Sequence, residues 1–425
     1  MLSVRDSFRL NGLRWRAAIR EHPHGFWVLI GALVLSVFSD AIAVWLKYHE
    51  FSFWRASLLI RGLTFVIAFG YLIYFRKTFQ NYKPYIFLIP LALLSFTSLW
   101  FGYYYRALFG IFDYINSSVT MIRLMYFFVF YFFVRAVVKS EKEINGLAKT
   151  IDCVFIVYLF FIVLGALADI QWLANSTHTG RPGYKGIIIA QNEATGFIIV
   201  CVAWYFLRYR LRQLSVYWLI TAVIAGFLVG NKGIYLGLPI LLFLLLVYGD
   251  GFKQRAKSLV TVIMTGITVL TALYFLSDAF KEIIHYFAKP IIRNLDSPAN
   301  LIHFVLNGRD IKAAHQIGLV IEQAQWTPLL GGFPIRGSFA GVDIIDISML
   351  FGVPFLLLYL AFYAKLFHPG PDASHIVRSH LATVFGIWML LAFTAGHLLF
   401  SAYNAPFMAI YVAYANAVHV DKKIS

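Results

Sequence analysis

Apolar stretches long enough to cross a membrane alternate along this chain with short basic connections. A helix needs about 20 apolar residues to cross the hydrocarbon core of a bilayer. Applied along the sequence, this rule predicts about twelve spans, and therefore an all-α polytopic membrane protein. The predicted spans are residues 25–46, 57–75, 84–104, 116–138, 149–173, 187–207, 213–229, 232–249, 258–277, 343–366, 379–400 and 404–419.

The composition agrees with this pattern. Of the 425 residues, 60% are hydrophobic and only 13% are charged, whereas a soluble domain has about 25% charged residues. The formal net charge of +16 would suit a nucleic-acid-binding protein, but the basic residues lie between the apolar stretches. That spacing is typical of the cytoplasmic loops of membrane proteins, so we expect no nucleic-acid partner.

The basic residues also predict the orientation. Residues 1–24 carry five arginines among apolar side chains, which indicates a basic amphipathic segment on the cytoplasmic surface, followed by an uncleaved signal anchor. Spans one to nine then occupy residues 25–277, spans ten to twelve occupy 343–419, and residues 420–425 form a cytoplasmic tail. With both termini inside, every cytoplasmic connection carries at least two Lys or Arg. Residues 278–342 are then an external loop.

This external loop has helical character of its own. Between Ile302 and Gln325, apolar residues recur at helical spacing, which predicts an amphipathic helix with Asn307 and Asp310 near its first turn. Thr327-Pro328 is expected to end the helix, and Gly331-Gly332 to form a flexible turn. The apolar positions are Ile311, Ala314, Ile317, Val320 and Ile321.

Arg309 is the leading candidate for binding an anion. It stands at the start of this predicted helix, where free N–H groups and the helix dipole favour negative charge. Its planar guanidinium fits two phosphate oxygens at once. The alternative is a salt bridge to Asp310 or Asp343. Arg293 and Lys312 are weaker anion-binding candidates on the same side of the membrane.

Asp343 and Asp346 are candidate catalytic carboxylates. Their i, i+3 spacing places them on one helix face at the start of the tenth predicted span. Asp343 has the alternative role of capping that helix. Asp346 is too deep for a cap, and a carboxylate beside apolar surface can serve as a general base.

A second group of candidates surrounds the sixth predicted span. A basic, glycine-containing turn precedes this span, two polar residues begin it, and a lysine follows in the next external turn, where glycines allow close approach of a ligand. The alternatives are a loop anchor, with the glutamate paired to a lysine, and an interfacial lysine. The candidates for binding a phosphate and a sugar are Arg181, Tyr184, Lys185, Asn192, Glu193 and Lys232.

Charged residues inside spans are costly and are usually paired or functional. Arg123 is the clearest case, with ligand binding, an internal ion pair and a snorkelling side chain as alternatives; Asp40 and Arg61 are expected to be structural partners. Cys153 and Cys201 fall in apolar runs and are expected to be small buried hydrophobes. The histidines of the external loop lack ligand spacing, so we expect no metal site and no cofactor.

The order of these motifs resembles the bacterial O-antigen polymerase and O-antigen ligase superfamily of membrane glycan transferases. The resemblance covers about residues 181–355 and rests on Arg-Pro-Gly-Tyr-Lys-Gly before Asn-Glu, Gly-Asn-Lys-Gly, Gly-Arg-Asp in the external loop, a tryptophan before Gly-Gly, and Asp-Ile-Ile-Asp followed by a glycine. Outside this range the resemblance lies in topology alone.

The resemblance implies a reaction and its location. A glycan carried on undecaprenyl pyrophosphate is transferred, with inversion and without a metal, to an acceptor hydroxyl at the periplasmic face of the bacterial cytoplasmic membrane. The family's arginines map onto Arg309 and Arg181, which would neutralise the leaving pyrophosphate. The lipid bilayer, a chain-length regulator and a flippase are the further partners that the resemblance suggests.

Three functions remain as alternatives. The polymerase-like members often carry a glutamate where this chain has Gly341, but the two aspartates are kept. The ligase-like members carry a histidine shortly before the tenth span, and this chain has none between residues 316 and 367. We therefore favour a polymerase over a ligase. A transporter or lipid flippase would favour inverted repeats, and no repeat is visible.

Overall fold

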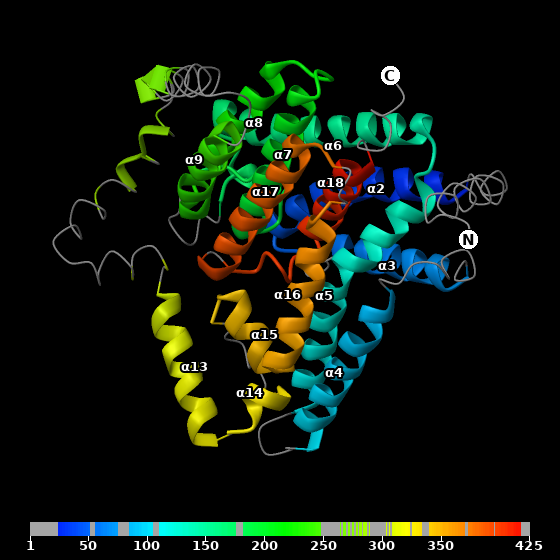
Figure 1. The fold of residues 1–425 in the computed structure, drawn as a ribbon. Helices are drawn as coiled ribbons and strands as arrows, with labels where there is room; N and C mark the ends of the chain where they lie inside the picture. The colour runs from blue at the N-terminus through cyan, green and yellow to red at the C-terminus, as the bar shows by residue number, and fades with distance from the viewer. Residues whose placement is uncertain are drawn as a thin grey trace, which may run out of the picture.

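The computed structural model shows an all-helical chain (Figure 1). It describes residues 24–51, 56–74, 85–104, 110–175, 182–247, 308–323, 325–333, 340–369, 373–394 and 396–417, with further residues between 264 and 306. The helices are α2 (His24–Tyr48), α3 (Ala56–Tyr74), α4 (Tyr85–Tyr104), α5 (Ile111–Val137), α6 (Glu141–Ala168), η2 (Gln171–Leu173), α7 (Gln191–Arg210), α8 (Val216–Leu228), α9 (Lys232–Val247), α13 (Arg309–Gln323), α14 (Thr327–Leu330), α15 (Asp343–Phe351), α16 (Val353–Phe367), α17 (His375–Thr394) and α18 (Asn404–Ala417).

The described helices confirm an all-α membrane protein. Among them α2, α3, α5, α6 and α17 are long and apolar enough to cross a membrane, and α4, α8, α9 and α16 contain shorter apolar stretches. Large apolar side chains such as Trp27, Phe38, Leu59 and Trp100 lie exposed on α2, α3 and α4. Water would penalise such a surface, whereas lipid tails solvate it at no cost.

The N-terminal segment 1–23, the tail 418–425 and most of the predicted span 258–277 lie outside the described residues. Elsewhere, the ends of some helices differ from the ends of the predicted spans, because local capping determines where a helix begins. Helix α6 begins at Glu141, before the predicted 149–173, because Ser140 and Glu143 form a reciprocal capping box. On α6, Cys153 is exposed on the outer side of the helix, contrary to the expected burial.

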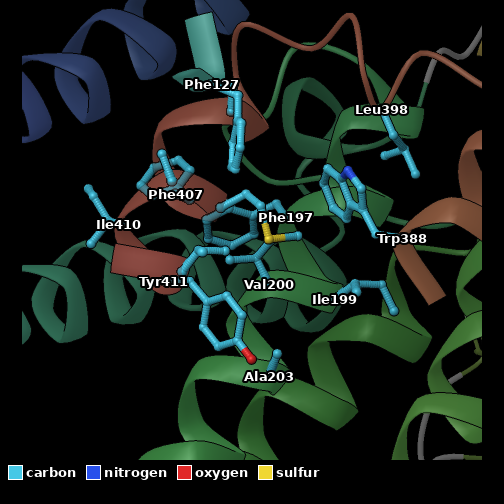
Figure 2. Packing of buried hydrophobic residues seen from close by; sticks show 14 of the residues in the cluster. Phe127, Phe197, Ile199, Val200, Ala203, Trp388, Leu398, Phe407, Ile410 and Tyr411 are labelled. Carbon is cyan, nitrogen blue, oxygen red and sulfur yellow. The ribbon is translucent and has the colours of Figure 1, made fainter. Parts of the chain in front are cut away.

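The centre of the molecule is formed by α7 and α18. Every residue from Ala194 to Arg208 on α7 and from Asn404 to Ala415 on α18 is buried, as expected for helices surrounded by other helices. Phe197 of α7 and Phe407 of α18 lie at the middle of this core (Figure 2). Cys201 is buried here, as predicted.

The predicted span 343–366 is two helices, α15 and α16. They are separated at Gly352, whose φ of +84° is open to glycine but strained for other residues. Gly331 and Leu329 press against Gly352, and Gly332 N–H and Phe333 N–H donate to the carbonyls of Leu350 and Met349 at 2.8 and 3.0 Å. The segment after α14 is therefore joined to the end of α15, which sequence periodicity alone does not reveal.

The predicted amphipathic helix is present as α13, at the edge of the molecule and beside α15 (Figure 1). Asp310 lies in its first turn, as predicted. Helix α13 ends at Gln323. A further short helix, α14, begins at Thr327-Pro328, because proline is tolerated in the first turn of a helix. Of the predicted apolar face, Val320 is buried with Phe333 and Met349, whereas Ile311 and Ile321 are exposed.

Candidate functional site

The site is built around two buried carboxylates at the start of α15. Asp343 is fully buried, and its side chain accepts three backbone N–H groups from the segment between α17 and α18. Leu398 N–H and Leu399 N–H each donate at 2.8 Å, and His397 N–H donates to the other carboxylate oxygen. The side chain of Leu398 inserts beside Trp388 in the core (Figure 2). Together these contacts fix the segment 396–399 against α15.

Asp346 fixes a second segment in the same way. It is also fully buried, and it accepts Ala340 N–H at 2.8 Å and Gly341 N–H at 3.1 Å on its two oxygens. The two segments touch each other, because a Cβ on Gly396 would lie only 1.8 Å from the Gly341 carbonyl oxygen. Each aspartate therefore holds one of two segments, 340–341 and 396–399. Together these segments form a compact double loop at the N-terminal end of α15.

Arg309 lies against this double loop. Its Nη1 donates to the Thr394 carbonyl at the end of α17 at 2.7 Å, and its side chain passes within 2.9 to 3.3 Å of the space that a Gly341 Cβ would occupy. The positive charge of Arg309 also interacts with Asp346. The glycine at position 341 leaves room for the arginine to lie flat on the loop.

The positive charges of three side chains act on His397 of this loop. Burial lowers the pKa of His397 to about 4, and the charges of Arg309, Arg123 and Lys312 lower it in the same direction. These cations come from α13 and from the middle of α5, so helices far apart in sequence bring their positive charges to one place. The backbone of His397 has a φ of +62°, a left-handed conformation that histidine adopts more readily than most residues.

Glu193 connects this cluster to the core. On the first turn of α7, its Oε1 accepts the Ser401 hydroxyl at 3.3 Å, and its backbone carbonyl accepts Asn404 Nδ2 at 3.1 Å. The charge of Glu193 interacts with Arg123 on one side and with Arg61 on the other. The structure therefore brings Glu193, Arg123, Arg309 and Lys312 of the sequence prediction into one region with the two aspartates. Asn192 is the other binding candidate on this turn, and its Oδ1 accepts a hydrogen bond from Asn231 Nδ2 at 3.5 Å.

The basic turn before α7 has a different environment. Tyr184 donates its hydroxyl to Asp169, and Lys185 Nζ donates to the Ala174 carbonyl at 2.6 Å. Burial and the charge of Lys47 lower the pKa of Lys185 to about 8. Gly183 and Gly230 pack backbone against backbone, so this turn meets the turn that precedes Lys232, the first residue of α9. Arg181 and Arg293 lie outside the described residues.

Asp40 and Arg61 form a buried ion pair between α2 and α3, the partnership that the sequence predicts. Tyr158 donates its hydroxyl to Asp40 at 2.6 Å, and the Arg61 guanidinium lies 4.6 Å from the Tyr403 ring centroid. The alternative salt bridges predicted for Arg309 involve carboxylates with other contacts here: Asp310 lies 3.0 Å from His303, and Asp343 accepts the loop N–H groups.

Sequence reasoning missed His397. It lies near the end of the predicted span 379–400, and no motif marks it. The only local signal is Ala395-Gly396-His397, where a glycine interrupts the end of an apolar run. Gly396 has a φ of +62°, so this glycine does mark a turn.

Within the described residues, no group of three or more His, Cys, Asp or Glu side chains is arranged to hold a metal. What the site offers is positive charge at a loop held by two buried carboxylates, which suits an anionic ligand. Comparison with protein-family models gives no match. Comparisons with curated proteins and with solved structures give none either.

Proposed function

We propose that this protein is a bacterial cell-surface polysaccharide polymerase. It transfers a glycan from undecaprenyl pyrophosphate to a hydroxyl of a lipid-linked acceptor repeat, with inversion. The chain crosses the cytoplasmic membrane about twelve times, has both termini in the cytoplasm, and carries its site at the periplasmic face. The order of sequence motifs suggests this reaction, and the cationic cluster supplies the chemistry that it needs.

The observation that carries the proposal is the position of Arg309 on the double loop, where its Nη1 donates to the Thr394 carbonyl at 2.7 Å and where the positive charges of Arg123 and Lys312 also act. Glycosyl transfer from a lipid diphosphate places growing negative charge on the leaving diphosphate. Cations already fixed in position stabilise that charge without reorganisation. At a spacing of 4 Å and an effective dielectric constant near 20, one such charge pair is worth about 4 kcal/mol.

The geometry also gives roles to the neighbouring residues. Asp343 and Asp346 hold the double loop on which Arg309 lies. We expect Glu193, which accepts the Ser401 hydroxyl, to accept hydrogen bonds from sugar hydroxyls as well. The sequence hypothesis that Asp346 is the general base stays a prediction, and it competes with the loop-holding role of that side chain.

Replacement of Arg309 tests the proposal. We expect Arg309→Ala to abolish chain elongation, since removal of one preorganised charge-stabilising group typically costs 100- to 1,000-fold in rate, by rough analogy with oxyanion-hole donors. Arg309→Lys should restore only part of the activity, because an ammonium lacks the planar fork. The measurement is the polysaccharide chain-length profile of cells that carry each variant, with membrane insertion checked by immunoblotting.

Arg378→Ala is the matched control, because Arg378 is an exposed arginine at the opposite end of α17 from Thr394. We expect it to leave the profile unchanged. Normal long chains in the Arg309→Ala strain would refute the proposed role of the cluster. The species that accumulates separates polymerase from ligase: single repeats indicate a lost polymerase, and long chains left on the carrier indicate a lost ligase.

A further inference from the structure

A recess lies where the end of α5, the start of α6 and the end of α18 meet, at the opposite end of α18 from Asn404. It offers about 270 Å³ of space. Half-buried residues form its mouth, among them Arg135, Ile144 and Ala417, and buried residues form its floor. Apart from Arg135 and Tyr414, the lining side chains are aliphatic. The recess therefore combines one cation with an apolar wall.

A second cation lies beside this mouth. Lys139 follows Arg135 by four residues and is half-buried. Burial and the positive charge of Arg135 lower the pKa of Lys139 to about 7, against the opposing charge of Glu143. Glu143 Oε2 accepts the backbone N–H groups of Lys139 and Ser140, each at 2.9 Å, so this carboxylate is held at the start of α6. Two positive groups close together favour an anion between them.

Arg135 can bind such an anion alongside its contacts within the protein. A guanidinium carries five N–H donors, and its planar fork fits phosphate oxygens. The aliphatic wall beside it suits a hydrocarbon chain. The recess thus matches a ligand that is anionic at one end and apolar at the other.

The first turn of α2 indicates the depth of the recess in the membrane. A Cβ on Gly25 would lie 2.7 Å from Val137 Cγ1, and one on Gly146 would lie 3.2 Å from the Phe26 ring. The start of α2 is therefore level with the end of α5 and the start of α6. Trp27, the next residue of α2, is 66% exposed. Tryptophans on a membrane protein's surface gather at the level of the lipid headgroups.

The floor of the recess is held in place by polar contacts. The Tyr414 hydroxyl donates to Gln213 Oε1 at 2.6 Å, and Arg208 Nε donates to the same oxygen at 3.2 Å. Arg208 also forms an ion pair with Asp152 of α6. These contacts join α6, α7 and α18 below the recess, so its shape is fixed before a ligand arrives.

We propose that this recess is a binding site for an anionic phospholipid, with the lipid phosphate between Arg135 and Lys139 and one acyl chain entering along the aliphatic wall. The recess is too small for a whole lipid, so the rest of the molecule lies along the outside of the protein. Basic pockets between membrane helices bind anionic headgroups in this way. In the proposed orientation the lipid belongs to the cytoplasmic leaflet. The site does not depend on the proposed glycan transfer.

The experiment measures lipid binding to the full chain purified in detergent, by native mass spectrometry. The probes are short-chain phosphatidylglycerol, which is anionic, phosphatidylcholine with the same chains, which is zwitterionic, and glycerol 3-phosphate, which has no chain. We expect phosphatidylglycerol to bind most tightly and to raise the unfolding temperature. Glycerol 3-phosphate should bind more weakly than phosphatidylglycerol, because it makes no contact with the aliphatic wall.

Variants separate the charged part of the recess from its apolar part. Arg135→Gln should weaken phosphatidylglycerol binding by about tenfold or more, the usual loss for a hydrogen bond to a charged group, and Arg135→Lys should weaken it less. Ala417→Phe fills the mouth without changing any charge and should also weaken binding. The matched control is Lys142→Gln, which removes an exposed cation of the same basic segment and should bind like the wild type.

The unfolding temperature of each variant without added lipid checks its folding, and the Ala417→Phe result does not depend on Arg135. Equal affinity of the wild type for phosphatidylglycerol and phosphatidylcholine would overturn the inference, as would unchanged phosphatidylglycerol binding in both Arg135→Gln and Ala417→Phe. Glycerol 3-phosphate that binds as tightly as phosphatidylglycerol would assign the recess to a soluble phosphate instead. Binding of none of the probes would leave it to the chain's own residues 418–425, which follow Ala417, and would also contradict the lipid site.

Discussion

At the scale of single residues, the site depends on how buried carboxylates are used. A buried charge needs several hydrogen bonds to offset its desolvation. Asp343 obtains three from one loop and Asp346 obtains two from another. Such a side chain contributes through the backbone that it holds. The i, i+3 spacing identified these two residues correctly as neighbours, but spacing alone does not distinguish a base from a loop anchor.

The two aspartates should differ in their effect on stability. In Asp343→Asn and Asp346→Asn, an NH₂ group replaces one acceptor oxygen and leaves at least one buried N–H without an acceptor, which costs about 1–3 kcal/mol for each such group. Because Asp343 accepts more donors, Asp343→Asn should lower the unfolding temperature more than Asp346→Asn. Thermal unfolding of the purified variants in one detergent measures this order.

Activity measured on the same variants tests the competing hypothesis. If Asp346 is the general base, Asp346→Asn will lose much more activity than its loss of stability explains. If it only holds the loop, its activity will fall in step with its stability. An activity loss in Asp346→Asn no larger than that in Asp343→Asn would contradict the general-base role of Asp346.

At the scale of elements, the site depends on two loops that pack backbone against backbone. Such contacts need glycine, because a side chain would fill the space between the chains. Gly396 contacts the Gly341 carbonyl, and both residues have positive φ. One loop follows the end of α17 and the other precedes the start of α15. The end of α17 is therefore joined to the start of α15 through these loops. Arg309 then joins α13 to the same point through Thr394.

Gly396→Ala should therefore disrupt the site. The added Cβ would lie 1.8 Å from the Gly341 carbonyl oxygen, at a φ of +62°, so the loops must separate and Arg309 must lose its support. We expect loss of pyrophosphate binding and of glycan transfer, with a lowered unfolding temperature. Gly386→Ala, within the preceding helix α17 and with open space around it, is the control and should be neutral or slightly stabilising. Unchanged pyrophosphate binding by Gly396→Ala would contradict the role of this contact.

These elements show what the sequence could and could not predict. Long apolar runs predicted α2, α3, α5 and α17 well, because membrane spans leave a strong one-dimensional signal. The break at Gly352 and the double loop were missed, since they depend on contacts between distant segments. His397 was missed for the same reason. The positive charges that act on it belong to α5 and α13, and neither helix is near it in sequence.

At the scale of the whole molecule, the polarity of α5 indicates where the site lies. Its first half contains Asp113, Asn116, Ser117, Ser118 and Thr120, whereas Leu124 to Val134 is apolar and aromatic throughout. Arg123 stands at this boundary, about 21 Å of helix from Val137. That length is shorter than the roughly 30 Å hydrocarbon core, so a span with Val137 at one boundary carries Arg123 within the membrane, where charged side chains are usually paired or functional. The cluster is thus suited to a ligand held partly in the membrane.

The orientation of the chain is the remaining premise, and labelling of single cysteines tests it. In a background that carries Cys153→Ser and Cys201→Ala, we consider Lys142→Cys at the start of α6 and His315→Cys on α13. Both positions are exposed, so their reactivity depends on the side of the membrane and not on burial. A membrane-impermeant maleimide should label His315→Cys in intact spheroplasts, and Lys142→Cys only after lysis, because residues 135–149, where α5 ends and α6 begins, carry four Lys or Arg, as is typical of cytoplasmic connections. The reverse pattern would place the cationic cluster in the cytoplasm, where the proposed donor does not lie, and the polymerase proposal would fail with it.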